Sequence, residues 1–132
     1  MNYRIIAFII GTWFLFMIFA IINAVIRNII YKPIIGDLRA HQISTIIFIA
    51  IILIVTYFSF RLSKIQLTTQ QIFIIGTIWL LATICFEFIA GHYAFGNSWD
   101  TLFADYNVLK GRIWIFVLIT LFLSPFITNK LL

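Results

Sequence analysis

The side chains of this sequence that could do chemistry occupy few positions. The chain has four carboxylates and two histidines among 132 residues. All of them lie in or beside two short polar stretches, residues 27–42 and 87–112, that interrupt long apolar segments. Carboxylates and imidazoles act as general acids and bases, as metal ligands and as partners of cations. Any chemistry is therefore expected at these residues: Asp37, His41, Glu87, His92, Asp100 and Asp105.

Glu87 has the most unusual context of the six. It lies inside an apolar segment, about one helical turn from the end of that segment. In a membrane, an acid at that depth is costly unless it is paired, protonated or directed into a bundle interior. At helical spacing it shares a face with Gly76 and Thr83, and small residues mark the faces where membrane helices approach each other. We expect Glu87 to point into a helix bundle.

Two arginines at helix ends are candidate partners for Glu87. Arg27 ends the first apolar segment, with Asn23 one turn below it, and Arg112 opens the last segment. A guanidinium suits bidentate pairing with a carboxylate. Two interpretations stay open: a structural ion pair that locks helices together, or a site that binds a polar or charged group or carries protons.

The two histidines lie at the same end of the expected bundle. Together with Glu87 and Asp105, they have side chains of the types that bind transition metals. However, the spacing matches no HxxxH or ExxH pattern, and His41 lies outside the apolar segment that a haem ligand would need. We expect no metal and no other cofactor. His41 and His92 are instead expected to hydrogen-bond to backbone or to lipid headgroups.

The polar stretch before the last apolar segment predicts a surface helix over residues 98–109. Asn97 is its candidate N-cap, and Asp100 would be the third helical residue. Apolar side chains recur there at helical spacing, which is typical of a helix in the membrane interface. This helix would either anchor the protein among headgroups or cover a pocket. The apolar side chains are Trp99, Leu102, Phe103, Tyr106 and Leu109.

The expected polar cluster extends into this stretch. Asp105 can pair with Arg112, Lys110 or Arg39, and Gly111 allows a sharp turn into the last helix. No catalytic triad, phosphate loop or HExxH helix is present. The complete predicted cluster is Asn23, Arg27, Arg39, His41, Glu87, His92, Asp105, Asn107 and Arg112.

Composition indicates that these residues belong to a membrane protein. Hydrophobic residues make up 64% of the chain and charged residues 10%, whereas a soluble domain is about half apolar and about a quarter charged. The predicted fold is all-α: one domain, residues 1–132, that forms an integral membrane four-helix bundle with the short interfacial helix before the fourth span. The spans, each near the roughly 20 residues that cross a bilayer, are residues 5–26, 43–60, 72–91 and 113–128.

Local signals refine the predicted helices. Asp37 is a candidate N-cap of the second helix, which would then begin before the membrane and carry His41, Ser44 and Thr45 on one face. The fourth span contains Pro125. Its missing N–H frees a carbonyl, which a neighbouring serine hydroxyl can satisfy.

Basic residues do not orient the predicted bundle. With four spans, both termini and the loop at residues 61–71 share one side, and the two polar stretches share the other. The two sides carry nearly equal numbers of Lys and Arg, so the positive-inside rule does not choose between the two orientations. The bases of the first side are Arg4, Arg61, Lys64 and Lys130, and those of the second are Arg27, Lys32, Arg39, Lys110 and Arg112. Because the bases stand singly at helix ends, the net charge of +5 does not indicate a nucleic-acid partner.

The polar positions also carry a resemblance. The chain resembles a family of small bacterial four-helix integral membrane proteins whose activity is uncharacterised. The resemblance implies a multi-pass protein of a bacterial inner membrane and implies no activity. The matching motifs are NAVIR at 23–27, Pro33, Gly36, FEF at 86–88, GHY at 91–93, Gly96, SW at 98–99, DYN at 105–107, GR at 111–112 and Trp114.

Three functions remain open at this point. The leading one binds or transports a small polar or ionic ligand, or a lipid headgroup, in a pocket centred on Glu87, and transport would require a homo-oligomer. The second is a non-catalytic subunit or assembly factor of a larger membrane complex. The third is a small membrane enzyme acting on a lipid or quinone, with Glu87 or His92 as acid or base. Since no motif supports a reaction, a non-enzymatic role is favoured.

Overall fold

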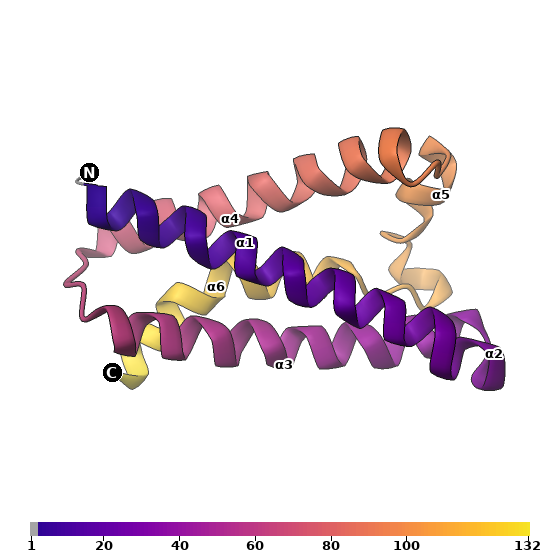
Figure 1. The fold of residues 1–132 in the computed structure, drawn as a ribbon, viewed down its shortest axis with the longest axis horizontal. Coiled ribbons are helices and arrows are strands. Elements are labelled where there is room, and N and C mark those ends of the chain that lie inside the picture. The colour runs from indigo at the N-terminus through magenta and orange to yellow at the C-terminus, as the bar shows by residue number, and fades with distance from the viewer. Residues whose placement is uncertain (1–2) are drawn as a thin grey trace.

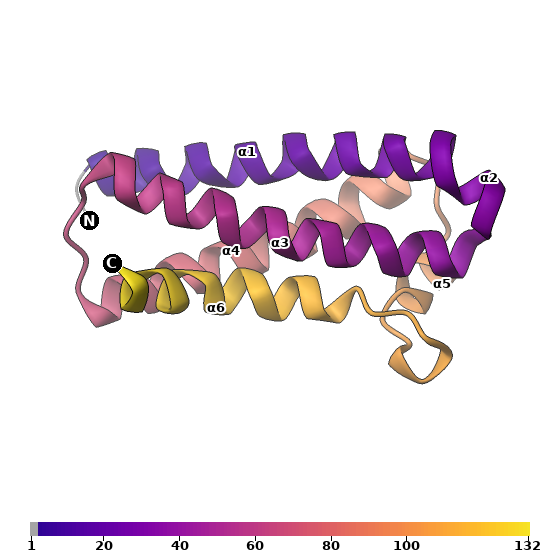
Figure 2. The same cartoon turned by 90° about the horizontal axis from the view of Figure 1, so that it is seen from below.

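Long helices dominate the architecture. The computed structural model describes residues 3–132, and within that range every regular element is helical and no strand occurs. The long helices run side by side along the long axis of the molecule (Figures 1 and 2). They coincide with the four apolar segments, so the all-helical prediction is confirmed. Their bounds are α1 Tyr3–Ile26, α3 Asp37–Ser63, α4 Thr69–Ile89 and α6 Ile115–Leu131.

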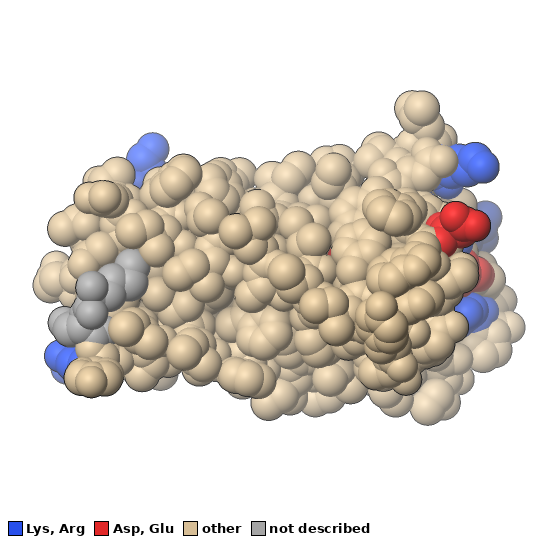
Figure 3. Space-filling model, turned by 90° about the horizontal axis from the view of Figure 1, so that it is seen from above, with Lys and Arg blue, Asp and Glu red and all other residues tan. Residues whose placement is uncertain are grey.

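The outer surface of these helices is apolar. Three helical stretches are long and apolar enough to cross a membrane, whereas α6 is a shorter apolar helix. In the most apolar stretch of Tyr3–Ile35, only 28% is buried inside the protein. Lys and Arg appear at both ends of the molecule, and the long middle of the visible face is almost uncharged (Figure 3). A helix that is apolar on all sides and largely unburied by protein needs a non-aqueous solvent, which indicates a membrane protein.

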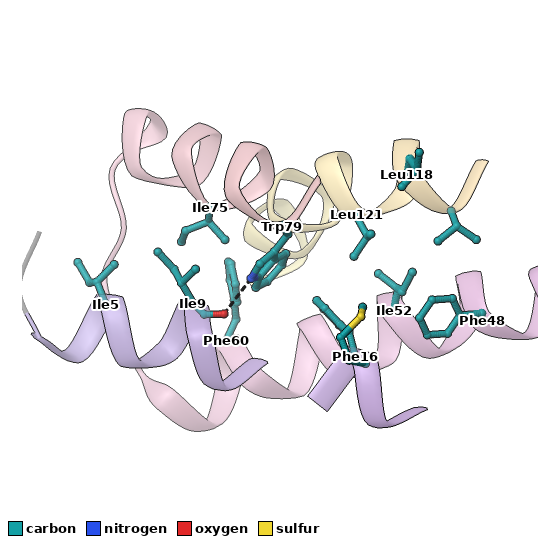
Figure 4. Packing of buried hydrophobic residues seen from close by; sticks show 12 residues of the cluster. Ile5, Ile9, Phe16, Phe48, Ile52, Phe60, Ile75, Trp79, Leu118 and Leu121 are labelled. Atoms are coloured by element: carbon teal, nitrogen blue, oxygen red, sulfur yellow. Dashed lines mark hydrogen bonds between the residues drawn. The ribbon is translucent and has the colours of Figure 1, made fainter. Parts of the chain in front are cut away.

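The core lies between the long helices, along the bundle axis (Figure 4). Phe16 of α1, Ile52 of α3, Trp79 of α4 and Leu121 of α6 each have no exposed surface. Trp79 packs edge-on against Phe16, with 5.0 Å between ring centroids. Its indole N–H, which would be costly to bury alone, donates to the carbonyl oxygen of Ile9 at 3.1 Å. This bond joins α4 to α1.

The backbones of α4 and α6 approach each other closely at Gly76. A Cβ atom at Gly76 would lie 2.5 Å from the carbonyl oxygen of Phe122. Only a residue without a side chain fits there, which confirms that this face of α4 packs against a neighbouring helix. Thr83, two turns further along the same face, is buried and accepts a hydrogen bond from the indole of Trp13.

The proline in α6 is accommodated as predicted. An unbroken helix would satisfy the carbonyl of Leu121 with the N–H of the residue four positions later, which here is Pro125. The hydroxyl of Ser124 donates to that carbonyl at 3.2 Å instead. Both Ser124 and Pro125 are buried.

The connection from α1 to α3 lies at one end of the bundle. Helix α1 continues through a π-helical turn, η1 (Arg27–Tyr31), into the short helix α2 (Lys32–Ile35). The chain then reverses at Gly36, whose φ of 90° favours glycine. The prediction that Asp37 is the N-cap of α3 is wrong, because Gly36 holds that position and Asp37 is the first helical residue.

The connection from α4 to α6 differs from its prediction. Helix α4 ends in a π-helical turn, η2 (Ala90–Ala94), and is followed by α5 (Trp99–Ala104) and the short 3-10 turn η3 (Val108–Lys110). A single helix over residues 98–109 is therefore wrong: α5 has six residues. Its N-cap is Ser98 rather than Asn97, and the Ser98 hydroxyl accepts the N–H of Thr101.

Helix length explains why this end of the bundle is open. Helix α6 has 17 residues and so extends about 25 Å, whereas α3 has 27 residues and extends about 40 Å. The chain between η2 and α6 folds over the end that α6 does not reach (Figure 2). The N-terminal end of α1 and the C-terminus lie together at the opposite end (Figure 1).

Candidate functional site

A cavity of about 550 Å³ lies at the open end of the bundle. Its walls come from α1, α3, α4 and the chain between η2 and α6. Ligand pockets in proteins have volumes of about 300–1,000 Å³, so a small molecule would fit. The apolar part of the lining includes Met17, Phe48 and Phe86. The charged part consists of Arg27, Lys32, Asp37, Glu87, Asp105 and Arg112.

Glu87 lines this cavity, and its two carboxylate oxygens have different surroundings. Its Oε2 atom accepts two hydrogen bonds, from the Tyr106 hydroxyl and from the Trp114 indole, each 2.7 Å long. Within residues 3–132, no hydrogen bond reaches Oε1, and Oε1 is not a fully buried atom without a partner. Oε1 is therefore accessible and free to accept a hydrogen bond. The bonds to Oε2 hold the side chain in one orientation.

Of the two interpretations left open for Glu87, the structural ion pair with an arginine does not form within the described residues. No ion pair forms between Glu87 and either Arg27 or Arg112 in the described chain. The space beside Oε2 is taken by Tyr106 and Trp114, which the turns before α6 bring against α4. Both donors are neutral, so the carboxylate has hydrogen bonds but no neutralising charge next to it.

Tyr106 is held as a hydrogen-bond donor. Burial raises the pKa of the Tyr106 phenol, and its hydrogen bond to Glu87 raises that pKa further. The phenol ring stacks on Phe88, with 5.8 Å between ring centroids. Sequence reasoning placed Tyr106 on an apolar stripe and did not select Trp114. A signal for both was that each carries an N–H or O–H donor close in sequence to polar residues of the cluster.

Arg27 also lines the cavity, at the residue that follows α1. Its guanidinium donates to the Ser44 hydroxyl at 3.2 Å and to the side-chain oxygen of Asn28 at 3.4 Å. One turn earlier, Asn23 donates to the Ser44 carbonyl at 2.8 Å. The two bonds to Ser44 tie this end of α1 to α3, and all three bonds go to neutral groups. Among the described residues, Arg27 has no carboxylate within ion-pair distance.

Asp37 is the carboxylate that does form ion pairs. It pairs with Lys32 at 3.4 Å and with Arg112. The pairing joins α2, the start of α3 and the chain before α6. None of the three candidate pairings of Asp105, with Arg112, Lys110 or Arg39, forms in the part of the chain described, and Arg112 binds Asp37 instead. Asp37 is not in the cluster predicted from the sequence, which assigns it to the N-cap of a helix.

His41 is buried and lines the cavity. Its Nε2 atom accepts the backbone N–H of Ile113 at 3.3 Å. This bond assigns the proton of the neutral imidazole to Nδ1. The carbonyl of His41 accepts the hydroxyls of Ser44 and Thr45, which confirms that the three residues share one face of α3.

His92 lies outside the cavity lining. Its Nδ1 atom is 2.8 Å from the carbonyl oxygen of Asn97, and its ring stacks on Trp99 with 3.8 Å between centroids. Both histidines therefore bond to backbone, as predicted. Within residues 3–132, no group of three His, Cys, Asp or Glu side chains gathers as a metal-ligand set.

The predicted cluster thus divides into two groups. Arg39, His92 and Asn107 do not line the cavity. The structure brings the other six to one cavity: Asn23, Arg27, His41, Glu87, Asp105 and Arg112.

The sequence and fold were compared with protein-family models, curated proteins and solved structures, and no match was found.

Proposed function

We propose that this chain is a multi-pass membrane protein that binds a small polar or ionic molecule, or a lipid headgroup, in the cavity beside Glu87. In this proposal the four long helices cross the bilayer as one bundle. The resemblance to small bacterial four-helix proteins supports a bacterial inner membrane as its location.

One observation carries the proposal: Glu87 lines the cavity with a carboxylate oxygen that has no hydrogen bond, and within the described residues it has no ion-pair partner. A structural ion pair would have used Arg27 or Arg112, yet both bond elsewhere. Keeping an unneutralised carboxylate near lipid costs free energy. A bound cationic or hydrogen-bonding group at Oε1 would recover part of that cost.

Ligand-dependent stabilisation tests this function. We would measure thermal unfolding of the detergent-purified protein with a panel of inorganic ions, amines, phosphates and short-chain lipids. A true ligand at 100 times its Kd stabilises the folded state by about 2.7 kcal/mol. At least one member of the panel is expected to raise the melting temperature of the wild type.

Glu87→Gln and Asp100→Asn form a matched pair for this experiment. Both remove one negative charge, but Asp100 is exposed and does not line the cavity. We expect the ligand effect to persist in Asp100→Asn and to be lost in Glu87→Gln. An undiminished ligand effect in Glu87→Gln, or no effect of any panel member on the wild type, would exclude the proposed site.

A further inference from the structure

The charged side chains around the cavity are balanced in number. Three bases and three acids line it, and His41 is bonded as a neutral imidazole. With its acids ionised, the lining therefore carries no net charge. A lone cation or a lone anion would leave the filled cavity with an uncompensated charge in a membrane protein, which is unfavourable. A ligand without net charge avoids this cost.

The acids and bases of the lining come from different elements. Arg27 and Lys32 come from η1 and α2, and Glu87 and Asp105 come from α4 and the end of α5. Asp37 binds both Lys32 and Arg112. Within the described residues, the charged lining groups outside an ion pair are therefore Arg27, Glu87 and Asp105.

The hydrogen bonds leave one group of each sign available in the cavity lining. Glu87 has no hydrogen bond at Oε1 within the described residues, while Tyr106 and Trp114 bond to Oε2. The guanidinium of Arg27 bonds only to the neutral oxygens of Ser44 and Asn28. No ion pair joins Arg27 to Glu87 in the described residues. A cationic group can therefore bind at Glu87 while an anionic group binds at Arg27.

We propose that the ligand of this cavity is a zwitterion, with an ammonium group that binds Glu87 and a phosphate group that binds Arg27. This inference rests on the proposed function and names its ligand class. Phosphate suits Arg27 because a guanidinium is one of the groups that commonly bind it. The ligand is either a free phosphodiester that carries an amine or the headgroup of a lipid, and both share this chemistry.

Binding of three simple probes tests the inference. Glycerophosphoethanolamine, a phosphodiester with one ammonium group, carries both charges and no net charge. Ethanolamine carries only the cation and inorganic phosphate only the anion. Isothermal titration calorimetry on the detergent-purified full chain is expected to give a Kd for glycerophosphoethanolamine at least about tenfold lower than for either single ion, a difference of about 1.4 kcal/mol. If ethanolamine or phosphate binds as tightly as glycerophosphoethanolamine, the inference is overturned.

Variants of the two charged residues give separate expected results. Glu87→Gln should remove the advantage of glycerophosphoethanolamine over phosphate, and Arg27→Gln should remove its advantage over ethanolamine. Lys110→Gln, which removes a base outside the cavity lining, should leave all three affinities unchanged. Equal losses for every probe in both cavity variants would overturn the assignment of the two charges to the two residues.

A fourth probe identifies the source of the zwitterion. Lysophosphatidylethanolamine carries the same headgroup on an acyl chain, and the cavity lining contains apolar residues such as Met17 and Phe86. Tighter binding of this lipid than of glycerophosphoethanolamine supports a lipid headgroup, and equal binding supports a free zwitterion. If a single ion binds the wild type as tightly as the zwitterion does and fails to bind Glu87→Gln, the proposed function stands and the zwitterion fails. If no probe or panel member binds, both fail.

Discussion

Two tyrosines near the open end of the bundle have hydroxyl groups with opposite expected effects on stability. The Tyr106 hydroxyl donates to Glu87 at 2.7 Å, whereas the Tyr31 hydroxyl is buried and, among the described residues, is the buried side-chain polar atom left without a partner. A hydrogen bond to a charged group contributes about 1.5–3 kcal/mol, and a buried group without a partner costs about 1–3 kcal/mol. Whether a hydroxyl stabilises or destabilises the folded protein therefore depends on whether it has a hydrogen-bond partner.

Replacing each tyrosine by phenylalanine should therefore give different results. We expect Tyr106→Phe to lower the free energy of unfolding by about 1–3 kcal/mol, because the donor to Glu87 is removed. Tyr31→Phe should leave that free energy unchanged or raise it. Denaturant unfolding in detergent, followed by circular dichroism, measures both. Similar destabilisation by the two substitutions would contradict the hydrogen-bond assignment.

Alkaline pH provides a second measurement on Tyr106. Its pKa in the folded protein is raised above the ordinary value of about 10. The stabilisation from its neutral phenol is then fully present below about pH 10 and is lost as the pH rises through the folded-state pKa. The stability difference between wild type and Tyr106→Phe should be constant up to about pH 10 and should decrease above it. An increase above that pH would contradict the raised pKa.

At the scale of helices, backbone contact replaces side-chain packing where α4 crosses α6. Gly76 lies where a Cβ atom would meet a backbone oxygen of α6 at 2.5 Å. By contrast, Gly11 on α1 has no atom within 4 Å of the same hypothetical Cβ. The close contact with α6 therefore requires glycine at Gly76, whereas no steric contact requires it at Gly11.

Alanine substitution should separate these two glycines. Gly76→Ala should lower the free energy of unfolding by about 1–3 kcal/mol, because the helices must move apart. Gly11→Ala should raise it by up to about 1 kcal/mol, since alanine is the better helix former. Thermal unfolding of both variants in the same detergent is the measurement. Equal tolerance of alanine at both positions would mean that α4 and α6 do not approach this closely.

The serine before the proline of α6 offers a test of helix repair. Ser124→Ala should lower the free energy of unfolding by about 1 kcal/mol, because the Leu121 carbonyl loses its donor. In a Pro125→Ala background the backbone N–H returns, so the same substitution should cost less. A double-mutant cycle measures this coupling, expected at about 0.5–1.5 kcal/mol. Additive effects would show that Ser124 does not replace the missing N–H.

At the scale of the whole molecule, acids and bases are arranged differently along the long axis. Bases lie at both ends, and the acids lie at or near one end, around the cavity. Nine-tenths of the chain carries no charge, with charged residues at 10%. This distribution fits a bundle whose middle lies in lipid and whose two ends reach the opposite membrane surfaces.

Cysteine labelling tests whether the two ends lie on opposite sides of a membrane. In a Cys85→Ser background, Asp100→Cys marks the cavity end and Lys130→Cys marks the end of α6. We expect an impermeant maleimide to label one position in sealed proteoliposomes of uniform orientation and the other only after permeabilisation. Labelling of both positions before permeabilisation would contradict the four-span arrangement or a single orientation.

The positions of the long helices, and the end of the molecule where polar groups gather, are predictable from the sequence alone. Apolar runs near 20 residues predict helices because backbone groups in an apolar solvent must bond within their own segment. Helical periodicity also predicted the packing face of α4 and the shared face of His41, Ser44 and Thr45. These features depend on residues close in sequence, so short-range rules describe them.

Which charged side chains bond to each other depends on the tertiary structure and cannot be predicted from the sequence. Several bases stand at the same end of the bundle, and helical spacing gives the direction of each side chain but not its distance from another helix. Arg112 pairs with Asp37, and Glu87 bonds to Tyr106 and Trp114. That outcome depends on α6 being shorter than α3 and on the turns that fill the remaining space. A carboxylate bonds to the donors that the backbone brings within about 3 Å, and packing of the whole chain sets that distance.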